Sequence, residues 1–241
     1  MLGSGFMPGR RLVIPTRCPP LDRLLEGGFP AGFLSLVYGE AETGKTTLAL
    51  QCSVNCVRMG FKAIYVDCEG GFSVERLAQL AAFDWEEVSP SIILIQPTSF
   101  RQQAHVVDHL DQYVDGRVGL VVVDTITSLY RVELGESESA FALNRELNRQ
   151  IATLTRLAKD FKLVVMMTSQ VHGVPTERGY EVLPVATRVL KFWSDIVLRL
   201  EAAGRVQVRR AVLEKHPHRR GRLLCHFRLS QDGMRGVEDW S

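Results

Sequence analysis

The sequence predicts an α/β fold with a mostly parallel central sheet, helices on both faces, and antiparallel strands near the C-terminal end. Three observations predict it. Short apolar, β-branched runs alternate with amphipathic segments over most of the chain, which is typical of parallel strands covered by helices. A glycine-rich loop joins one of these strands to a helix. After about residue 195 the strands leave almost no room for helices, which predicts hairpins.

The first half of the chain shows the start and stop signals of these elements. A short helix should end at Gly27-Gly28, because glycine tolerates the backbone that closes a helix. Ser73 suits the N-cap of another helix. The expected elements are a helix over 18–25, a strand over 34–38, a helix that begins near 47, a strand over 63–67 and a helix over 73–83.

The second half continues the alternation and then changes. The expected elements are a strand over 92–95, an amphipathic helix over 99–113, a strand over 120–124, a long helix over 140–159 and a strand over 163–168. Three strands follow, over 196–200, 205–213 and 223–229. Glycine and proline in the segments between them favour tight turns, so we expect these strands to be antiparallel.

Length and composition favour one domain. The 241 residues are enough for a full core, and we expect residues 1–17, rich in Gly, Pro and Arg, to form an arm before a core domain over 18–241. No apolar run of about 18 residues occurs, and the N-terminus lacks the apolar core of a secretory signal. Five cysteines without regular spacing favour an intracellular protein, with Cys52 and Cys56 packed in the core.

A phosphate-binding P-loop is the most specific motif. The pattern Gly-x-x-x-x-Gly-Lys-Thr supplies backbone N–H groups, a lysine and a hydroxyl for Mg²⁺, and the helix after it favours anions at its N-terminus. The alternative, a chance glycine-rich turn, does not explain the preceding strand and following helix. We therefore expect ATP and Mg²⁺ as cofactors, bound by Gly39, Glu40, Ala41, Glu42, Thr43, Gly44, Lys45, Thr46 and Thr47.

Three further polar residues come at the ends of expected strands. Asp124 ends an apolar strand, where a carboxylate can hold Mg²⁺ together with the Thr46 hydroxyl. Glu69 and Gln170 follow two other strands, whose carboxyl ends should meet in the same crevice. A glutamate there can orient and deprotonate water, and a glutamine can sense the γ-phosphate. Spacing alone leaves open whether these two merely solvate the edge of the sheet.

The chain resembles the RecA/RadA recombinase family in order from about residue 12 to 230. It is most similar to the archaeal paralogues of RadA that lack the N-terminal helical domain. The motifs that carry the resemblance are Gly39-Glu40-Ala41-Glu42-Thr43-Gly44-Lys45-Thr46, residues 65–77 (YVDCEGGFSVERL), residues 121–131 (VVVDTITSLYR), residues 147–150 (LNRQ), residues 168–171 (TSQV) and Leu213-Glu214-Lys215-His216.

The resemblance implies a RecA-like P-loop NTPase core. It implies Glu69 as the carboxylate that activates water, Gln170 as a relay between nucleotide and DNA, and Arg76 as a stacking partner of the adenine. It also implies a homo-oligomer in which the ATP site lies between subunits, with Lys215 at a neighbour's nucleotide. Its implied partners are DNA without sequence preference, the main recombinase RadA and a junction nuclease.

Some segments depart from the family pattern. The polymerisation motif should be an aromatic residue and an alanine three positions later, but the arm offers Phe6-Met7-Pro8-Gly9. Val185-Ala186 stand where the DNA-binding loop should carry glycines. The loop after Asp124 contains acidic residues, which are unsuited to a phosphate backbone: Glu133, Glu136 and Glu138. These departures argue against a strand-exchange enzyme.

Net charge is only +2, but basic residues concentrate near the C-terminal end. We expect DNA contacts from Arg219, Arg220 and Arg222, in a turn between two strands, with a solvated turn as the alternative. We also expect DNA contacts from a lesser cluster of Arg188 and Lys191. Phe192 and Trp193 beside them could stack on bases, but we expect these two to pack in the core. A metal site from His216, His218, Cys225 and His226 lacks a ligand pair of the right spacing.

Two functions of different classes remain open. The first is a DNA repair and homologous recombination protein of the cytoplasm and nucleoid, which binds ATP and DNA, hydrolyses ATP slowly and regulates a recombinase. The second is a regulatory ATPase similar to KaiC, with protein partners and no DNA. A ring-forming motor ATPase would need an extension and a translocating loop, and neither stands out in the sequence. DNA binding at low salt separates the first two.

Overall fold

The computed structural model describes residues 11–136, 140–176, 179–184 and 186–237, and its centre is a nine-stranded sheet. The strand order is β13-β12-β11-β10-β3-β7-β6-β4-β5. The strands are β3 (Leu34–Gly39), β4 (Lys62–Asp67), β5 (Ile92–Ile95), β6 (Val118–Asp124), β7 (Val164–Ser169), β10 (Ile196–Ala202), β11 (Val208–Lys215), β12 (Leu223–Ser230) and β13 (Gly233–Gly236).

The pairing confirms the predicted fold class. Strands β10, β3, β7, β6, β4 and β5 are parallel, and β11, β12 and β13 continue the sheet in antiparallel pairs. All residues of β3, β6 and β7 are buried, as expected for strands that are covered on both faces.

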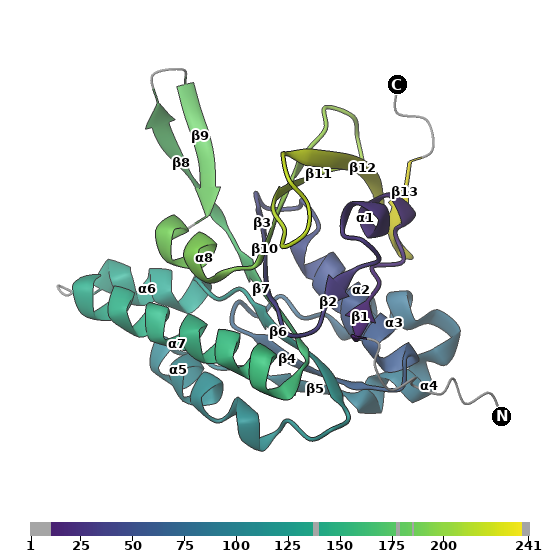
Figure 1. Ribbon diagram of the computed structural model, residues 1–241, viewed down its shortest axis with the longest axis horizontal. Coiled ribbons are helices and arrows are strands. Elements are labelled where there is room, and N and C mark those ends of the chain that lie inside the picture. The colour runs from purple at the N-terminus through teal and green to yellow at the C-terminus, as the bar shows by residue number, and fades with distance from the viewer. Residues whose placement is uncertain (1–10, 137–139, 177–178, 185, 238–241) are drawn as a thin grey trace.

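Helices cover both faces of the sheet (Figure 1). One face carries α1 (Pro19–Leu24), α2 (Lys45–Arg58), α3 (Val74–Ala81) and α4 (Trp85–Val88). The other carries α5 (Phe100–Asp108), α6 (Ser128–Glu136), α7 (Ala140–Phe161) and α8 (Thr187–Trp193). Short 3₁₀ segments occur at Ala82–Asp84, Ser89–Ser91 and Leu110–Gln112.

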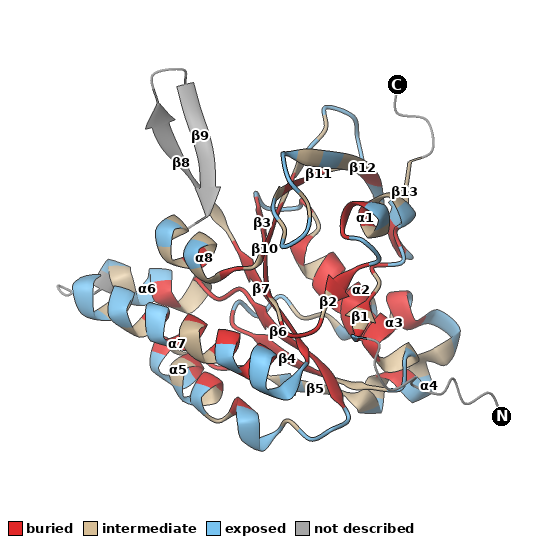
Figure 2. Cartoon of the chain, in the orientation of Figure 1, coloured by how far each residue is buried: buried red, intermediate tan, exposed pale blue. Residues whose placement is uncertain are grey.

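Two hydrophobic clusters hold these layers together. Because side chains alternate along a strand, Tyr65 packs towards α2 while Ile64 packs towards α7. Figure 2 shows the strands and the inner sides of α2 and α7 as buried, with exposed residues on the outer sides of the helices. Cys52 and Cys56 are buried in the first cluster, as the sequence predicts.

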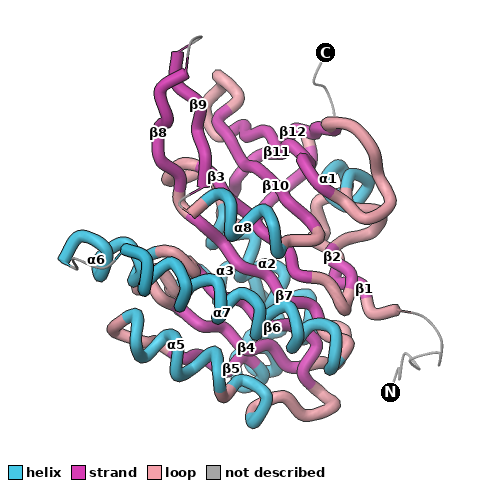
Figure 3. Tube along the Cα trace, turned by 60° about the vertical axis from the view of Figure 1, so that its left-hand side comes forward, coloured by secondary structure: helices cyan, strands magenta, loops and turns pink. Residues whose placement is uncertain are grey.

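Two small sheets were not predicted. Strand β1 (Val13–Ile14) pairs with β2 (Phe29–Pro30), and β8 (Val171–Thr176) forms a hairpin with β9 (Gly179–Pro184). The hairpin stands away from the nine-stranded sheet in two views (Figures 1 and 3). Gly173, Pro175 and Pro184 favoured a loop there, but a hairpin needs few contacts with the core and tolerates them.

Several expected boundaries moved. Strand β11 begins three residues later than expected, at Val208, because Gly204 and Gln207 adopt positive φ and turn the chain. The helix expected over 99–113 becomes 3₁₀ after Asp108. The arm expected over 1–17 lies outside the described residues up to residue 10, but Leu12, Ile14 and Thr16 are buried. In the part of the chain that the structure describes, no helix could cross a membrane.

Candidate nucleotide-binding site

The P-loop runs from the end of β3 to the start of α2. Gly44 takes φ of 101° at the N-cap of α2, a conformation that glycine adopts without strain. A Cβ at Gly44 would lie only 2.8 Å from Leu229 and 2.9 Å from Met234, and one at Gly39 only 2.1 Å from the Leu200 carbonyl oxygen. The C-terminal strands therefore pack closely on the loop. Packing against backbone requires glycine at position 39, and at position 44 the positive φ favours it.

Lys45 lies inside this loop and is only 8% exposed. Its Nζ donates to the carbonyl oxygens of Gly39 at 2.9 Å and Glu40 at 2.7 Å. Burial lowers the pKa of Lys45, while the carboxylates of Asp124 and Glu69 act in the opposite direction. A cavity of about 400 Å³ opens beside it, lined by Glu42, Gly44, Lys45, Thr46, Thr47, Arg209 and Leu229.

Thr46 and Asp124 come together although they are far apart in the sequence. The Thr46 hydroxyl donates to Asp124 Oδ2 at 2.8 Å. Tyr65 donates to the same oxygen at 2.6 Å, and Thr168 donates to the other carboxylate oxygen. A hydroxyl and a carboxylate are hard oxygen donors, which suit Mg²⁺. The two residues predicted for the metal therefore form a donor set that fits this ion.

Glu69 and Gln170 also meet at this edge. The Gln170 amide donates to Glu69 Oε1, and Arg131 Nη1 donates to Gln170 Oε1 at 2.7 Å. Burial raises the pKa of Glu69, and the negative charge of Asp124 raises it further. Glu69 and Gln170 thus form a hydrogen-bonded pair and do not merely contact solvent at the edge of the sheet. Their catalytic roles stay predictions.

Arg76 and Lys215 are engaged elsewhere in the described chain. The Arg76 guanidinium donates to the carbonyl oxygens of Ser230 at 2.8 Å and Gln231 at 2.5 Å, which ties α3 to the turn before β13. Lys215 is exposed and donates to the Lys191 carbonyl oxygen at 3.3 Å. Stacking of Arg76 on adenine and contact of Lys215 with a neighbouring subunit stay predictions.

The lesser basic cluster differs from its prediction. Lys191 forms an ion pair with Glu214 at 2.7 Å, and its Nζ lies 5.1 Å from the centre of the Tyr38 ring. Phe192 is 74% exposed, so its expected core packing is wrong. The helix α8 is short and turns this side chain outward, while Trp193 packs on the core and donates to Asn148. Arg188 is exposed.

The basic turn between β11 and β12 is also partly neutralised. Arg219 pairs with Glu26 at 3.2 Å and donates to the Arg23 carbonyl oxygen at 2.9 Å. This holds the turn against the end of α1. Arg220 and Arg222 are exposed and have no ion pair within the described residues. Two of the three arginines are therefore available to a partner.

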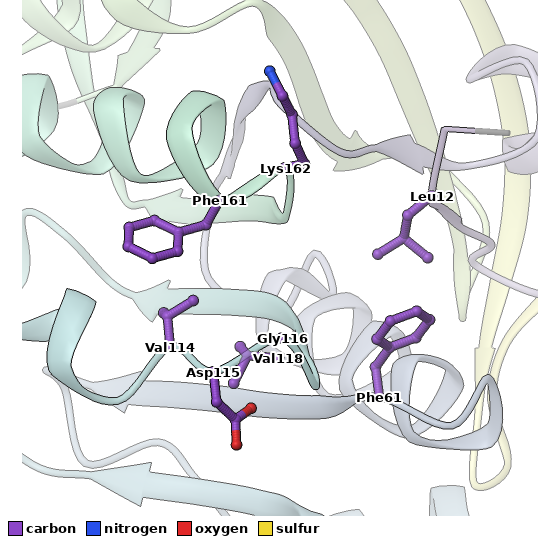
Figure 4. Close-up of a pocket in the computed structure, with 8 residues that line it drawn as sticks. All are labelled: Leu12, Phe61, Val114, Asp115, Gly116, Val118, Phe161 and Lys162. Atoms are coloured by element: carbon purple, nitrogen blue, oxygen red, sulfur yellow. The ribbon is translucent and has the colours of Figure 1, made fainter. Parts of the chain in front are cut away.

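A larger cavity of about 530 Å³ lies at the opposite edge of the sheet, where β6 begins (Figure 4). The apolar residues Leu12, Phe61 and Phe161 line this cavity, with the side chains of Leu12 and Phe61 pointing towards each other, and the charged ends of Asp115 and Lys162 point away from it. It lacks the phosphate-binding groups of the P-loop edge. We therefore place the nucleotide site at the smaller cavity.

Sequence reasoning missed four residues of the site: Tyr65, Asp67, Arg131 and Thr168. Tyr65 and Asp67 lie two positions apart on β4, so they share a face of the sheet. Asp67 pairs with Asp124 in the register of β4 and β6, which puts both strand ends together. For Asp67 a signal was present, a polar residue ending an apolar strand, which is the same signal that identified Asp124.

Some departures from the recombinase pattern cannot be placed. Phe6-Met7-Pro8-Gly9, Val185 and Glu138 lie outside the described residues. Ala186 is described and takes φ of 54°, a conformation in which glycine would be less strained. Glu133 is exposed on α6. The negative charge predicted for this segment is thus exposed to solvent at Glu133.

Comparisons with known proteins agree with the geometry. The Rad51 family model matches residues 10–237. The chain is 39% identical to the DNA repair and recombination protein RadB of Thermococcus kodakarensis, over 94% of this chain and 100% of the relative. It is 36% identical to the protein of that name from Methanococcoides burtonii, over 91% and 96%.

A solved structure described as the RadB recombinase is similar in fold. The TM-score is 0.81 at 39% sequence identity, over 93% of this chain and 100% of that chain. The resemblance seen in the sequence is therefore confirmed, both for the RecA-like core and for the archaeal branch. The chain belongs to the Rad51 family, among relatives named RadB.

Proposed function

We propose that this chain is an ATP-binding DNA repair and recombination protein that assists a main recombinase. One observation carries the proposal: Lys45, the Thr46–Asp124 pair and the Glu69–Gln170 pair converge at one edge of the sheet. The names of its relatives support the cellular role, since those proteins are described as DNA repair and recombination proteins. We place its action on DNA, in the cytoplasm and nucleoid.

The site supports ATP with Mg²⁺. Lys45 would supply positive charge to the terminal phosphates, and the α2 N-terminus would supply backbone N–H groups. Thr46 and Asp124 would hold Mg²⁺, which neutralises phosphate charge when bound. Glu69 would orient and deprotonate water, since its raised pKa makes it a better base than an ordinary glutamate. We propose slow hydrolysis, as the sequence departures favour regulation over catalysis.

Gln170 is placed to report the state of this site. It lies between β7 and β8 and contacts both Glu69 and Arg131 of α6. We propose that it transmits nucleotide occupancy to the neighbouring β8–β9 hairpin and α6. Lys215 is exposed, which is consistent with its proposed contact with a neighbour's nucleotide in a homo-oligomer.

For DNA we propose an electrostatic contact through Arg220 and Arg222. Changing both to Gln should lower DNA affinity by a similar factor for all sequences. Each lost phosphate contact reduces the slope of log K against log[salt] by about one unit, so the slope should fall by about two. Fluorescence anisotropy with single-stranded DNA at several salt concentrations measures both quantities.

Arg101→Gln on α5 is a matched control, because Arg101 is also exposed but lies on a helix that covers the sheet, away from the turn between β11 and β12. It should change neither affinity nor slope. A double variant that keeps the slope of the unchanged protein would show that the DNA contact lies elsewhere. No DNA binding at low salt, with or without ATP, would favour the regulatory ATPase similar to KaiC.

That second function has one observation in its favour. Two of the five residues predicted to contact DNA, Lys191 and Arg219, are already paired with Glu214 and Glu26. A protein that binds only protein partners needs no free basic surface. The remaining arginines decide between the two functions, which is why the salt slope is the first measurement.

Strand exchange by the purified protein alone should be absent or poor. A recombinase needs a continuous filament and a flexible DNA loop, and Ala186 restricts the backbone where glycine is expected. The assay is joint-molecule formation with ATP and homologous DNA, in the presence and absence of the recombinase RadA. Product that rises only when both proteins are present would support a mediator. Efficient product from this protein alone would make it a recombinase in its own right.

A further inference from the structure

Asp67 is a buried acidic residue to which the proposed mechanism gives no role. It ends β4 and is only 2% exposed, and within the described residues no cation pairs with it. Its Oδ1 accepts backbone N–H groups from Glu69 at 3.3 Å, Gly70 at 2.9 Å and Gly71 at 3.1 Å. A buried carboxylate needs such donors, because an unsatisfied charge in the interior is strongly unfavourable.

The second oxygen of Asp67 extends the same arrangement. Its Oδ2 accepts the Phe72 N–H at 3.1 Å and the Gln96 side-chain amide at 3.1 Å. Four of the five donors thus belong to one continuous segment of backbone, 69–72. The loop is wound around the carboxylate, and Gly70 takes φ of 74° to make this turn.

This loop carries Glu69 towards the nucleotide edge. The Cys68 N–H donates to the Asp124 carbonyl oxygen at 2.7 Å, which fixes the start of the loop against β6. Tyr65, two residues before Asp67, donates to the Asp124 carboxylate and packs its ring edge-on against Phe72, with centroids 5.1 Å apart. The backbone on either side of Glu69 is therefore fixed by contacts of Tyr65, Asp67 and Cys68, at and just after the end of β4.

We propose that Asp67 is a positioning residue that holds Glu69 where it can act on water at the nucleotide site. The inference rests on the proposed role of Glu69 as the base. A general base contributes only when it lies within hydrogen-bond reach of its proton. A displacement of about 1 Å can lower a rate by roughly 10². The carboxylate of Asp67 contacts neither the P-loop nor Thr46, so ATP binding should not depend on it.

The test compares Asp67→Asn with Glu69→Gln and with the double variant. In Asp67→Asn an NH₂ group replaces one carboxylate oxygen. Its hydrogens would face N–H groups that need an acceptor, which should loosen the loop. We expect turnover to fall by roughly 10–100-fold, within the range set by displacement of a base. The ATP dissociation constant, measured by calorimetry, should change by less than about twofold. The double variant should turn over no more slowly than Glu69→Gln alone, because the two changes remove the same step.

Gln96→Ala is the matched control. It removes one of the five donors and leaves the backbone N–H groups in place, so turnover should be nearly unchanged. If Asp67→Asn keeps normal turnover while Glu69→Gln loses it, Asp67 is not a positioning residue. If both variants keep normal turnover, the proposed role of Glu69 is wrong instead. Additive losses in the double variant would also contradict the proposal.

A second variant covers the case in which Asp67→Asn does not fold. A Cβ at Gly70 would meet no atom within 4 Å, but its φ of 74° is unfavourable for other residues. Gly70→Val therefore distorts the loop without a clash and without removing the buried carboxylate. It should lower turnover and retain ATP binding. Normal turnover in Gly70→Val would show that the loop geometry does not control Glu69.

Discussion

ATP binding should be lost when Lys45 is replaced by alanine. The ammonium group is the fixed positive charge of the loop, and hydrogen bonds to charged groups contribute about 1.5–3 kcal/mol each. Two such contacts with phosphates correspond to a loss of affinity of roughly 10²–10⁴. Isothermal titration calorimetry with Mg-ATP measures the effect.

The fold should survive this change. Burial lowers the pKa of Lys45, so the charged lysine opposes folding at every pH below that pKa, and its removal relieves this cost. The Gly39 and Glu40 carbonyl oxygens lose a donor, and Glu40 is exposed to water. Lys162→Ala, at the opposite edge of the sheet, should bind ATP normally. A folded Lys45→Ala protein that bound ATP with unchanged affinity would contradict the P-loop assignment.

Turnover should fall by about 10²–10⁴-fold in Glu69→Gln, the contribution of a general base, while ATP binding persists. The pH dependence gives a second signature. Burial raises the pKa of Glu69 above the ordinary glutamate value, and only the deprotonated form acts as a base. The rate should therefore fall as pH drops through that raised pKa, and this acidic limb should be absent from the residual rate of the Gln variant.

Glu42→Gln is the control, because Glu42 is another carboxylate at the nucleotide site, in the P-loop, where it lines the cavity beside Lys45. Steady-state phosphate release at several pH values measures all three proteins. Unchanged turnover in Glu69→Gln together with a loss in Glu42→Gln would transfer the base to Glu42. That result would leave the nucleotide site in place and change only its mechanism.

The fold and the P-loop were predictable because their signals are local. Buried strands appear as apolar runs, and the motif from Gly39 to Thr46 lies between a strand and a helix. Asp124 was found by the same reasoning, because it ends an apolar strand. Parallel strands bring such ends together, which is why Asp124 meets Thr46 across the sheet.

Contacts between distant segments were not predictable in this way. Arg219 pairs with Glu26, and Lys191 pairs with Glu214. Each partner lies on a distant segment, so the sequence around the basic residue does not indicate it. Asp67 is a different case. Its backbone donors are close in sequence, but they point at its carboxylate only once the loop over residues 69–72 has folded around it. The β8–β9 hairpin was missed because its glycines and prolines are typical of loops.

The packing of the C-terminal strands on the P-loop has a consequence for biosynthesis. Leu229 and Met234 lie against Gly44, and the Met234 N–H donates to Gln51 of α2 at 2.7 Å. These contacts join residues that are more than 180 positions apart, and long-range contacts form late and slowly. A chain emerging from the ribosome would thus carry the whole P-loop motif long before the strands β12 and β13, which pack against the loop, have been synthesised. Capture of nucleotide would then be expected only after the segment that contains Leu229 and Met234 has been synthesised and has packed on the loop.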